Sequence, residues 1–160
     1  MHTSSDQNAT HIATRLATLN DLASLAILFN AYRQFYQQAD DLPLAARFIR
    51  ERMERQESII FVAENAEYEL LGFCQLYPTF CSVVAAPIYT LYDLFVQPNT
   101  RKSGAGRALL LAAEQLAQQN NFARMDLTTA KTNQTAQRLY ESLGWRRDDV
   151  FYAYNKAISN

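Results

Sequence analysis

The stretch DLFVQPNTRKSGAGRALL, residues 93–110, joins an apolar, strand-like run to an apolar, helix-like series through a turn. Gly104 and Gly106 lie in this turn, directly before the helix. The start of a helix leaves about four backbone N–H groups without intrahelical partners and carries roughly half a positive charge. Glycine also removes the Cβ that would keep a bulky phosphate away from those amides. Together with the cations Arg101, Lys102 and Arg107, the stretch predicts a binding site for a pyrophosphate.

Other interpretations of the two glycines compete with this one. The G-x-G spacing is weaker evidence than a full dinucleotide fingerprint, because Leu109 stands in place of the third glycine. The phosphate-loop pattern G-x-x-x-x-G-K-[ST] is absent as well. The glycines can also be explained as only shaping a tight turn between strand and helix. The chain has four glycines and two of them lie in this turn, which favours the phosphate interpretation.

A second motif, TNQTAQRLYESLGW at residues 132–145, predicts a helix with Asn133, Ala136 and Tyr140 on one face. The small Ala136 would let an extended ligand lie between the Asn133 amide and the Tyr140 phenol. A phenol, with an ordinary pKa of about 10, can protonate a departing anion of similar basicity. The competing interpretation is a half-buried core tyrosine with a bonded hydroxyl. Gly144 is typical of the residue that follows the end of a helix.

The whole chain predicts a mixed α/β fold, with antiparallel strands in its first half and alternating strands and helices in its second. Thr18 and Asp21 resemble a helix start, although Glu or Gln is usual at the later position. A right-handed crossover places two of the expected strands in parallel. We expect a single domain over residues 1–160, with residues 1–10 flexible. The expected strands are 12–16, 58–64, 68–80, 88–96 and 123–130, with closing strands in 145–158, and the expected helices are 22–36, 44–55, 104–119 and 133–142.

Composition excludes several classes of function. The chain has 160 residues, 49% of them hydrophobic, and a formal net charge of -1, which argues against a general nucleic-acid binder. Cys74 and Cys81 are expected to be free thiols, and the two histidines show no metal-ligand spacing, so no metal is expected. No apolar run approaches the roughly 20 residues that a membrane span requires. The polar start lacks the layout of a signal peptide, so we expect a cytoplasmic protein.

The two motifs together resemble those of the GNAT acetyltransferase superfamily. The run VQPNTRKSGAG, from Val96 to Gly106, is similar to its R/Q-x-x-G-x-G/A acyl-CoA motif. The run NQTAQRLYESLGW, from Asn133 to Trp145, is similar to its N-x-x-A-x-x-x-Y-x-x-x-G-F/W helix, and the resemblance in element order covers essentially the whole chain. Asp93, three residues before Val96, resembles the histone and polyamine (spermidine/spermine-like) branch. The polyamine enzymes often carry a second acid where this chain has Tyr92.

The resemblance implies a GNAT-like fold, a mostly antiparallel sheet with one splayed parallel strand pair and flanking helices, that binds acetyl-CoA without a metal. It implies direct attack of an amine on the thioester, so neither cysteine needs a catalytic role. Asp93 would orient and deprotonate the amine, directly or through water, and Tyr140 would act as general acid near the sulfur. A structural carboxylate is the alternative for Asp93. The residues implied to bind the cofactor are Phe95 and Val96 through their backbone, Arg101, Lys102, Ser103, Gly104, Ala105, Gly106 and Arg107 at the pyrophosphate, and Asn133 and Tyr140.

The expected acceptor is a small primary amine, a polyamine-like molecule or a lysine side chain. The first two helices mix aromatic and acidic groups that suit a cation, although a solvated helical face explains them equally well. A catalytically inactive acyl-CoA sensor or assembly module and a nucleotide-binding α/β protein are the alternative functions. The aromatic run VFYAYNKAI, residues 150–158, favours either a homodimer through an added edge strand or a self-contained last strand. The aromatic and acidic residues are Tyr32, Phe35, Tyr36, Asp40, Asp41 and Glu51.

Overall fold

The computed structural model describes residues 11–159, so the predicted flexible segment 1–10 lies outside the described residues. The chain divides into two compact units, Met1–Thr128 and Thr129–Asn160. That all 160 residues act as a single domain stays a prediction.

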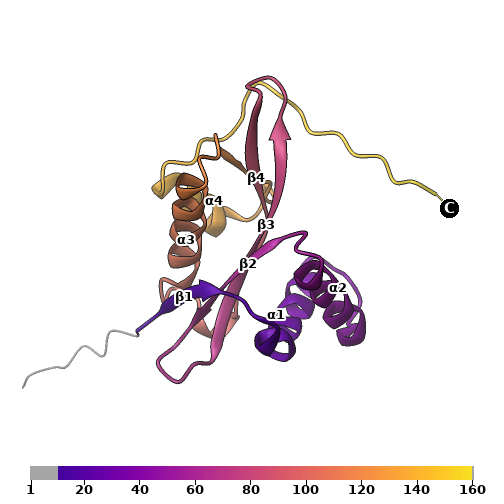
Figure 1. Ribbon diagram of the computed structural model, residues 1–160, viewed down its shortest axis with the longest axis vertical. Coiled ribbons are helices and arrows are strands. Elements are labelled where there is room, and N and C mark those ends of the chain that lie inside the picture. Colours follow the sequence, from indigo (N-terminus) through magenta and orange to yellow (C-terminus); the bar gives the residue numbers. More distant parts are fainter. Residues whose placement is uncertain (1–10, 160) are drawn as a thin grey trace, which may run out of the picture. The chain divides into compact units, whose positions relative to one another are not determined.

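The first unit is built on a mixed sheet with the strand order β1-β2-β3-β4-β5. Neighbouring strands are antiparallel except for β4 and β5, which are parallel and joined through a helical crossover. Figure 1 shows the long β3–β4 hairpin extending well past the helices α1 and α2. The predicted fold class is therefore confirmed. The strands are β1 (Ala13–Leu16), β2 (Ile59–Glu64), β3 (Leu70–Cys81), β4 (Ala86–Val96) and β5 (Met125–Asp126).

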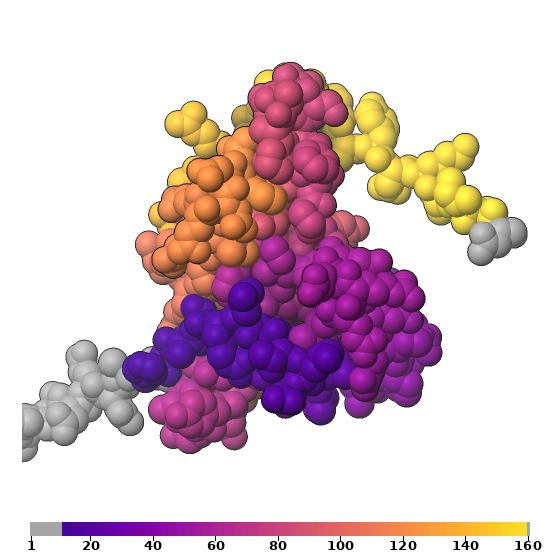
Figure 2. All heavy atoms as spheres, in the orientation of Figure 1, coloured from indigo at the N-terminus to yellow at the C-terminus, as the bar shows by residue number. Residues whose placement is uncertain are grey.

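Helices cover both faces of this sheet. On one face α1 (Leu22–Phe35) and α2 (Leu42–Glu54) pack together, and on the other lies α3 (Ala105–Gln119). Asp41 sets the start of α2 because its side chain accepts a hydrogen bond from the Leu44 N–H at 2.9 Å, with a proline in the first turn. In the space-filling view, the α1–α2 pair forms one rounded surface and the tip of the β3–β4 hairpin projects away from it (Figure 2).

Two apolar layers hold the sheet between its helices. Leu109, Leu110 and Ala113 of α3 are fully buried, and the Cys74 thiol donates to the Leu109 carbonyl at 3.8 Å. The core facing α1 and α2 is larger and includes stacked rings of Phe29 and Phe48, 5.4 Å apart. Its buried members are Leu22, Leu25, Leu28, Phe29, Ala45, Ile49, Ile60, Val62, Leu70, Phe73 and Phe95.

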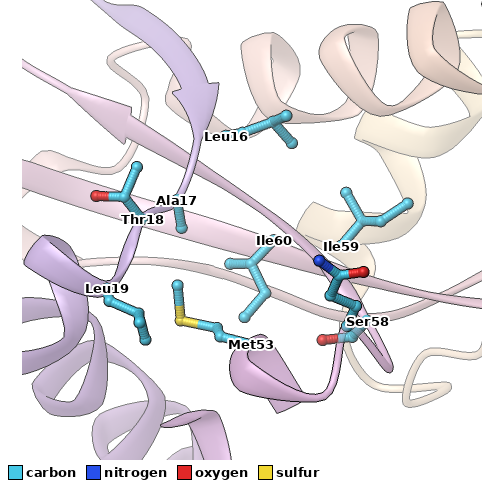
Figure 3. A pocket seen from close by; sticks show the side chains of 9 residues that line it. Leu16, Ala17, Thr18, Leu19, Met53, Ser58, Ile59 and Ile60 are labelled. Atoms are coloured by element: carbon cyan, nitrogen blue, oxygen red, sulfur yellow. The ribbon is translucent and has the colours of Figure 1, made fainter.

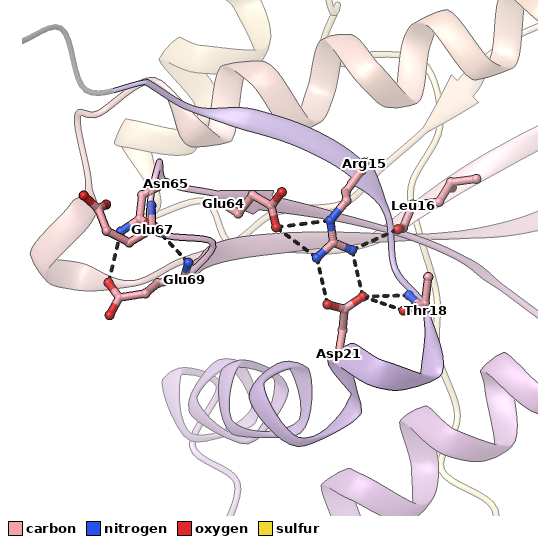
Figure 4. Close-up of polar contacts among 8 residues, drawn as sticks. All are labelled: Arg15, Leu16, Thr18, Asp21, Glu64, Asn65, Glu67 and Glu69. Carbon is pink, nitrogen blue, oxygen red and sulfur yellow. Dashed lines mark hydrogen bonds and ion pairs between the residues drawn. The ribbon is translucent and has the colours of Figure 1, made fainter.

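An ion-pair network ties β1 to β2 and to the short 3-10 helix η1 (Leu19–Asp21), as Figure 4 shows. Arg15 donates to both carboxylate oxygens of Asp21 at 2.8 Å and to Glu64 at 2.9 Å. Asp21 also accepts from the Thr18 N–H at 2.7 Å, so the helix start suggested by Thr18 and Asp21 is present. These bonds lower the pKa of Asp21 to about 2, with the Arg15 contact as the largest cause.

Strand lengths near the C-terminus differ from the prediction. The strand expected at 123–130 is reduced to two residues, Met125 and Asp126. The closing strands expected in 145–158 are wrong, because the described residues after 143 form no helix or strand. Aromatic and β-branched residues favour strands only where a neighbouring strand supplies hydrogen bonds, and here the apolar side chains are 79–91% exposed. These side chains are Val150, Phe151, Tyr152, Tyr154 and Ile158.

The second unit contains the helix α4 (Gln134–Ser142), which agrees with the predicted helix 133–142. Gly144 ends it at φ +87°, a left-handed conformation that favours glycine. The Trp145 N–H donates to the Tyr140 carbonyl and the Gly144 N–H to the Glu141 carbonyl, both at 3.1 Å. This is the Schellman arrangement, and the Tyr140 and Trp145 rings, 6.0 Å apart, supply its usual apolar contact. No helix among residues 11–159 is long and apolar enough to cross a membrane.

Candidate active site

Strands β4 and β5 part early, which leaves one side of β4 open. They pair only at Tyr89 with Met125 and at Thr90 with Asp126, whereas β4 continues to Val96. Among the described strands, none pairs with that side of β4 beyond Thr90. Unpaired strand amides and carbonyls of this kind can bind an extended ligand that carries its own amide groups.

The direction of the free backbone groups follows from strand alternation. The Gln97 N–H donates to the Leu71 carbonyl on β3 at 2.9 Å. In an antiparallel pair, alternate residues exchange hydrogen bonds with the partner, so the backbone groups of Phe95 also point to β3. Those of Val96 and Leu94 point to the open side. Val96 therefore stays a predicted contact, chiefly through its N–H because its carbonyl already accepts from Arg101, and Leu94 is an added candidate. The alternation does not favour the predicted contact of Phe95.

The turn after β4 exposes backbone at the start of α3. Lys102 has φ +68° and Gly104 has φ +92°. A Cβ built on Gly104 would meet nothing within 4 Å, so the space above this residue is open to a ligand. The first α-helical hydrogen bond runs from the Ala108 N–H to the Gly104 carbonyl at 2.9 Å, and the Ala105 N–H points to the Ser103 hydroxyl at 3.4 Å. Amides this early in a helix are suited to bind an anion.

A hollow of about 370 Å³ lies beside this turn. Arg101 is anchored next to it: its Nε donates to the Val96 carbonyl at 3.3 Å, and its guanidinium lies 5.9 Å from the centre of the Phe35 ring. Lys102 is exposed. The hollow therefore combines positive charge with open backbone, which fits a pyrophosphate. Its lining residues are Asn65, Leu71, Asn99, Thr100, Arg101, Lys102 and Ser103.

A larger hollow, of about 470 Å³, contains none of the predicted site residues (Figure 3). It lies among the end of β1, the end of α2 and the start of β2, and most of its labelled side chains are apolar. We therefore place the candidate site at the β4 end, where the backbone and the charges can bind a polar ligand.

Asp93 is buried on β4, with 4% of its surface exposed. The Gln75 amide donates to its carboxylate at 2.5 Å, and Ser58 donates to the other end of that amide at 2.7 Å. Burial raises the pKa of Asp93 above its ordinary value, while the hydrogen bonds from Gln75 and Tyr32 oppose that rise. A carboxylate whose pKa is raised becomes a stronger base, which suits proton abstraction.

Four tyrosines lie near this carboxylate: Tyr32 on α1, Tyr36 directly after α1, Tyr77 on β3 and Tyr92 on β4. The Tyr32 hydroxyl donates to the Tyr92 carbonyl at 3.2 Å, and the Tyr77 and Tyr92 rings lie 5.6 Å apart. Burial and the charge of Asp93 raise the pKa of Tyr32 and Tyr36, and raise that of Tyr77 to about 12. Tyr32, Tyr36 and Tyr77 are therefore neutral at physiological pH, and their hydroxyls can both donate and accept hydrogen bonds.

The acidic residues predicted on α1 and α2 have local roles. Asp40 accepts from the Asn30 amide at 2.7 Å, and Asp41 caps α2. Glu51 lies 3.5 Å from Arg52. The aromatic members of the same set lie close to Asp93 instead. The ring centres of Tyr32 and Tyr36, for example, are 5.1 Å apart. Asp93 and the tyrosines are thus gathered in one place, and the other acids are engaged in the helices.

Within the second unit, Asn133 caps α4, because its side-chain oxygen accepts from the Ala136 N–H at 3.2 Å. Its amide nitrogen remains a donor for a ligand group, as the motif interpretation requires. Tyr140 is buried, with 9% of its surface exposed, and packs against Trp145.

Sequence reasoning did not single out Gln75, Ser58, Tyr77 or Leu94. Gln75 carries a usable signal, because it is the one polar side chain in the apolar run LLGFCQLY. A polar residue at a fully buried strand position needs a partner, and here the partner is Asp93. No three His, Cys, Asp or Glu side chains among residues 11–159 are grouped so as to hold a metal ion.

The family of the chain follows from its similarity to known proteins. A family model described as the Acetyltransferase (GNAT) family matches residues 25–145. The "Uncharacterized N-acetyltransferase YhfO" of Bacillus subtilis is 47% identical over 140 residues, which cover 88% of this chain and 93% of the relative. The crystal structure of a probable acetyltransferase is 38% identical, with a TM-score of 0.85 over 94% of this chain and 99% of that one.

A further similar structure is that of the aminoglycoside N-acetyltransferase AAC(6')-Iy in complex with CoA. It has a TM-score of 0.78 and 17% identity, covers 92% of this chain and 97% of its own, and supports the fold alone. The matching family model, together with the relative and the solved structure of much higher identity, decides the assignment. The chain belongs to the acetyltransferase (GNAT) family and is an acetyltransferase that uses acetyl-CoA.

Proposed function

We propose that this acetyltransferase transfers the acetyl group of acetyl-CoA to a primary amine by direct attack, without an acetyl-enzyme intermediate. The observation that carries the proposal is the buried carboxylate of Asp93, which lies on β4 next to the segment that β5 leaves open. Strand β4 would therefore supply both the base and the open strand edge that binds the pantetheine arm of acetyl-CoA.

In this proposal acetyl-CoA binds in the first unit, at a seat formed by the open edge of β4 and the turn into α3. The backbone of Val96, with that of Leu94, would pair with the amides of the pantetheine arm. The turn from Arg101 to Arg107 would hold the pyrophosphate through backbone N–H groups and positive charge, and the open space above Gly104 admits it. Asn133 and Tyr140 remain proposed cofactor contacts on the strength of the motif resemblance. The same resemblance implied Phe95, but its backbone groups point to β3, so Leu94 and Val96 are the proposed strand contacts.

The amine must lose a proton before it can react. A primary ammonium has a pKa of about 10.4, so it is mostly protonated at pH 7. In this mechanism Asp93 takes that proton, and the amine nitrogen then attacks the thioester carbonyl carbon. The C–N bond forms, the C–S bond breaks, and Tyr140 donates its proton to the departing thiolate. General acid catalysis of this kind contributes a factor of about 10²–10⁴.

The acceptor class is a cationic amine: a small primary amine, a polyamine-like molecule or a lysine side chain. Support comes from the aromatic rings near Asp93, whose faces attract ammonium groups, and from the carboxylate itself. The resemblance to the histone and polyamine branch points the same way. Tyr92, standing where polyamine enzymes often have a second acid, makes a lysine side chain or a small amine as good an acceptor as a polyamine.

Release of free CoA thiol with a panel of amines tests the function. The panel contains spermidine, a lysine analogue, an aminoglycoside and a basic peptide. We expect turnover with at least one of them, a fall of 10²-fold or more in kcat for Tyr140→Phe, and an acetyl-CoA affinity close to wild type in that variant. Thermal stabilisation by CoA without turnover of any amine would instead favour the inactive sensor.

We also propose a homodimer and a cytoplasmic location. The exposed aromatic residues of 150–158 support the dimer, because a large apolar surface of this kind is usually covered by a partner. The free thiols of Cys74 and Cys81 are typical of a reducing compartment, which supports the location.

A further inference from the structure

Three side chains in the first unit form a hydrogen-bonded series that ends at the proposed base. The Ser58 hydroxyl donates to Gln75 Oε1 at 2.7 Å, and Gln75 Nε2 donates to Asp93 Oδ2 at 2.5 Å. Gln75 is fully buried and Asp93 nearly so, whereas Ser58 is half-buried and lines the hollow of Figure 3. The series thus runs from the border of that hollow to the carboxylate.

Every hydrogen bond of the series is donated in the direction from Ser58 to Asp93. An ionised carboxylate only accepts hydrogen bonds, so the Gln75 amide must turn its NH₂ group to Asp93. The amide oxygen then faces Ser58, whose hydroxyl must donate. Each partner therefore fixes the orientation of the next, and the amide cannot turn over without placing its oxygen against the carboxylate.

A bulge between β3 and β4 brings the two buried polar residues together. Gln75 pairs with Asp93, but the next residue, Leu76, pairs with Leu91, so Tyr92 is an extra residue on β4. Without this insertion, the register that pairs Leu76 with Leu91 would place Tyr92 opposite Gln75. The bulge thus places the two buried polar side chains opposite each other.

We propose that Gln75, held by Ser58, is a positioning residue that keeps the Asp93 carboxylate ionised and directs it toward the hydroxyl of Tyr32. The proposal rests on the proposed function, in which Asp93 is the base. Gln75 touches neither the amine nor acetyl-CoA and acts through Asp93.

The geometry also supplies a path for the proton of the amine. The Tyr32 hydroxyl donates to the Tyr92 carbonyl at 3.2 Å and is also a hydrogen-bond partner of Asp93, so its one proton can turn to either acceptor. The ammonium N–H proton passes to the Tyr32 oxygen as the Tyr32 proton passes to Asp93. The products are a neutral amine, a neutral phenol and a carboxylic acid, so charge and protons balance.

Few other titratable groups of the described chain face Asp93. They are Tyr32 on α1, Tyr36 directly after α1, Tyr77 on β3 and Tyr92 on β4. Arg52 of α2 and Glu57 act on Tyr77, and Asp93 acts on Cys74, on the other face of β3, only through its charge. The raised pKa values of Tyr32, Tyr36, Tyr77 and Cys74 keep these four groups neutral where Asp93 titrates. Asp93 therefore governs the acidic limb of the rate profile.

The test measures the pH dependence of kcat/KM in wild type, Gln75→Leu and Ser58→Ala, with the best amine of the panel. Loss of a hydrogen bond to the charged carboxylate moves the acidic limb upward by about one pH unit in Gln75→Leu. We expect a smaller upward movement in Ser58→Ala and a return to the wild-type profile in Ser58→Thr, which restores the hydroxyl. KM for acetyl-CoA stays within about twofold in all three, because none of them touches its seat.

Carbon-13 NMR titration of the aspartate side chains supplies a measurement that needs no acceptor. The Asp93 carboxyl resonance, assigned with Asp93→Asn, should titrate at higher pH in Gln75→Leu and Ser58→Ala than in wild type. Cys74→Ala is the matched control, because Cys74 is the buried neighbour of Gln75 on the other face of β3. It should lose stability while the Asp93 titration stays in place.

The outcomes separate this proposal from the proposed function. Full turnover in Asp93→Asn overturns the role of Asp93 as base, and the positioning role falls with it. A large loss in Asp93→Asn, with an unmoved limb and an unmoved titration in both Gln75→Leu and Ser58→Ala, overturns the positioning role alone.

Discussion

Asp93 combines a chemical requirement with a cost in stability. A carboxyl group whose pKa is raised by folding stabilises the protein only where it is protonated, and that contribution is lost as the pH rises from the unfolded pKa through the folded one. At pH 8 the ionised, buried group therefore opposes folding. Such costs concentrate at functional sites, where activity needs a group in an unfavourable environment.

The variant Asp93→Asn tests this balance. Asparagine is neutral and of similar shape, and its side-chain oxygen can still accept from Gln75. We expect turnover to fall and the free energy of unfolding at pH 8 to rise by about 1 kcal/mol, a gain that shrinks toward pH 4. Denaturant unfolding at both pH values measures it. A variant less stable than wild type at pH 8 would show that the carboxylate is structural.

The pKa of Asp21 is shifted in the opposite direction to that of Asp93, so its ionised form stabilises the folded protein. Its pKa is lowered to about 2 by Arg15, so its contribution is present above the unfolded pKa of about 4 and is lost as the pH falls toward 2. Since Arg15 is partly exposed, solvent screens the pair, and Asp21→Asn should cost about 1–2 kcal/mol at pH 7.

Unfolding measured at pH 7, 4 and 3 should show the difference between Asp21→Asn and wild type shrinking below pH 4. Asp126→Asn is the comparison, because it removes an ion pair of similar length, 2.7 Å to Arg124, between two more exposed side chains. Equal losses in the two variants at every pH would contradict the account of the Arg15 network.

At the scale of elements, the turn into α3 and the end of α4 offer a matched pair of glycines. Gly104 and Gly144 have φ of +92° and +87°, and an added Cβ would meet nothing within 4 Å at either position. Alanine should therefore cost each about 1 kcal/mol of stability through backbone strain alone. Only Gly104 lies in the proposed pyrophosphate seat.

We therefore expect Gly104→Ala to weaken CoA binding about tenfold or more, by strain and by placing a methyl group against the phosphates. Gly144→Ala should lose similar stability with a smaller loss of affinity. Calorimetric titration with CoA measures both. Equal affinities in the two variants would remove the Gly104 turn from the cofactor site.

The turn into α3 is also the element that the sequence predicts best. Proline, glycine and helical periodicity are local signals, so the end of β4 and the start of α3 are predicted within one or two residues. The bulge at Tyr92 and the pairing of Gln75 with Asp93 could not be predicted, because register depends on two strands at once. The predicted length of β5 was wrong for the same reason.

The predicted closing strand shows the limit of β propensity. The run from Val150 to Ile158 has strand-like composition, but a strand exists only in a ladder, and the described residues after 143 form none. At the scale of the whole molecule, this run exposes five large apolar side chains to solvent.

A homodimer would give the C-terminal run its role. We expect light scattering of the purified full-length chain to report a dimer, and a chain truncated after Asp149 to report a monomer with less bound hydrophobic dye per chain. A single charged substitution, Phe151→Asp, should weaken the dimer in the same way. A monomeric full-length chain at high protein concentration would contradict this.

The most direct test of the central claim is a single-turnover reaction of the wild-type enzyme with acetyl-CoA and the best amine of the panel. Free thiol, acetylated amine and the intact mass of the protein are measured in the same quenched samples. Direct attack predicts equal amounts of thiol and acetylated amine at every time, with the protein mass unchanged throughout. Thiol released before the acetylated amine, accompanied by an acetylated protein, would contradict the account.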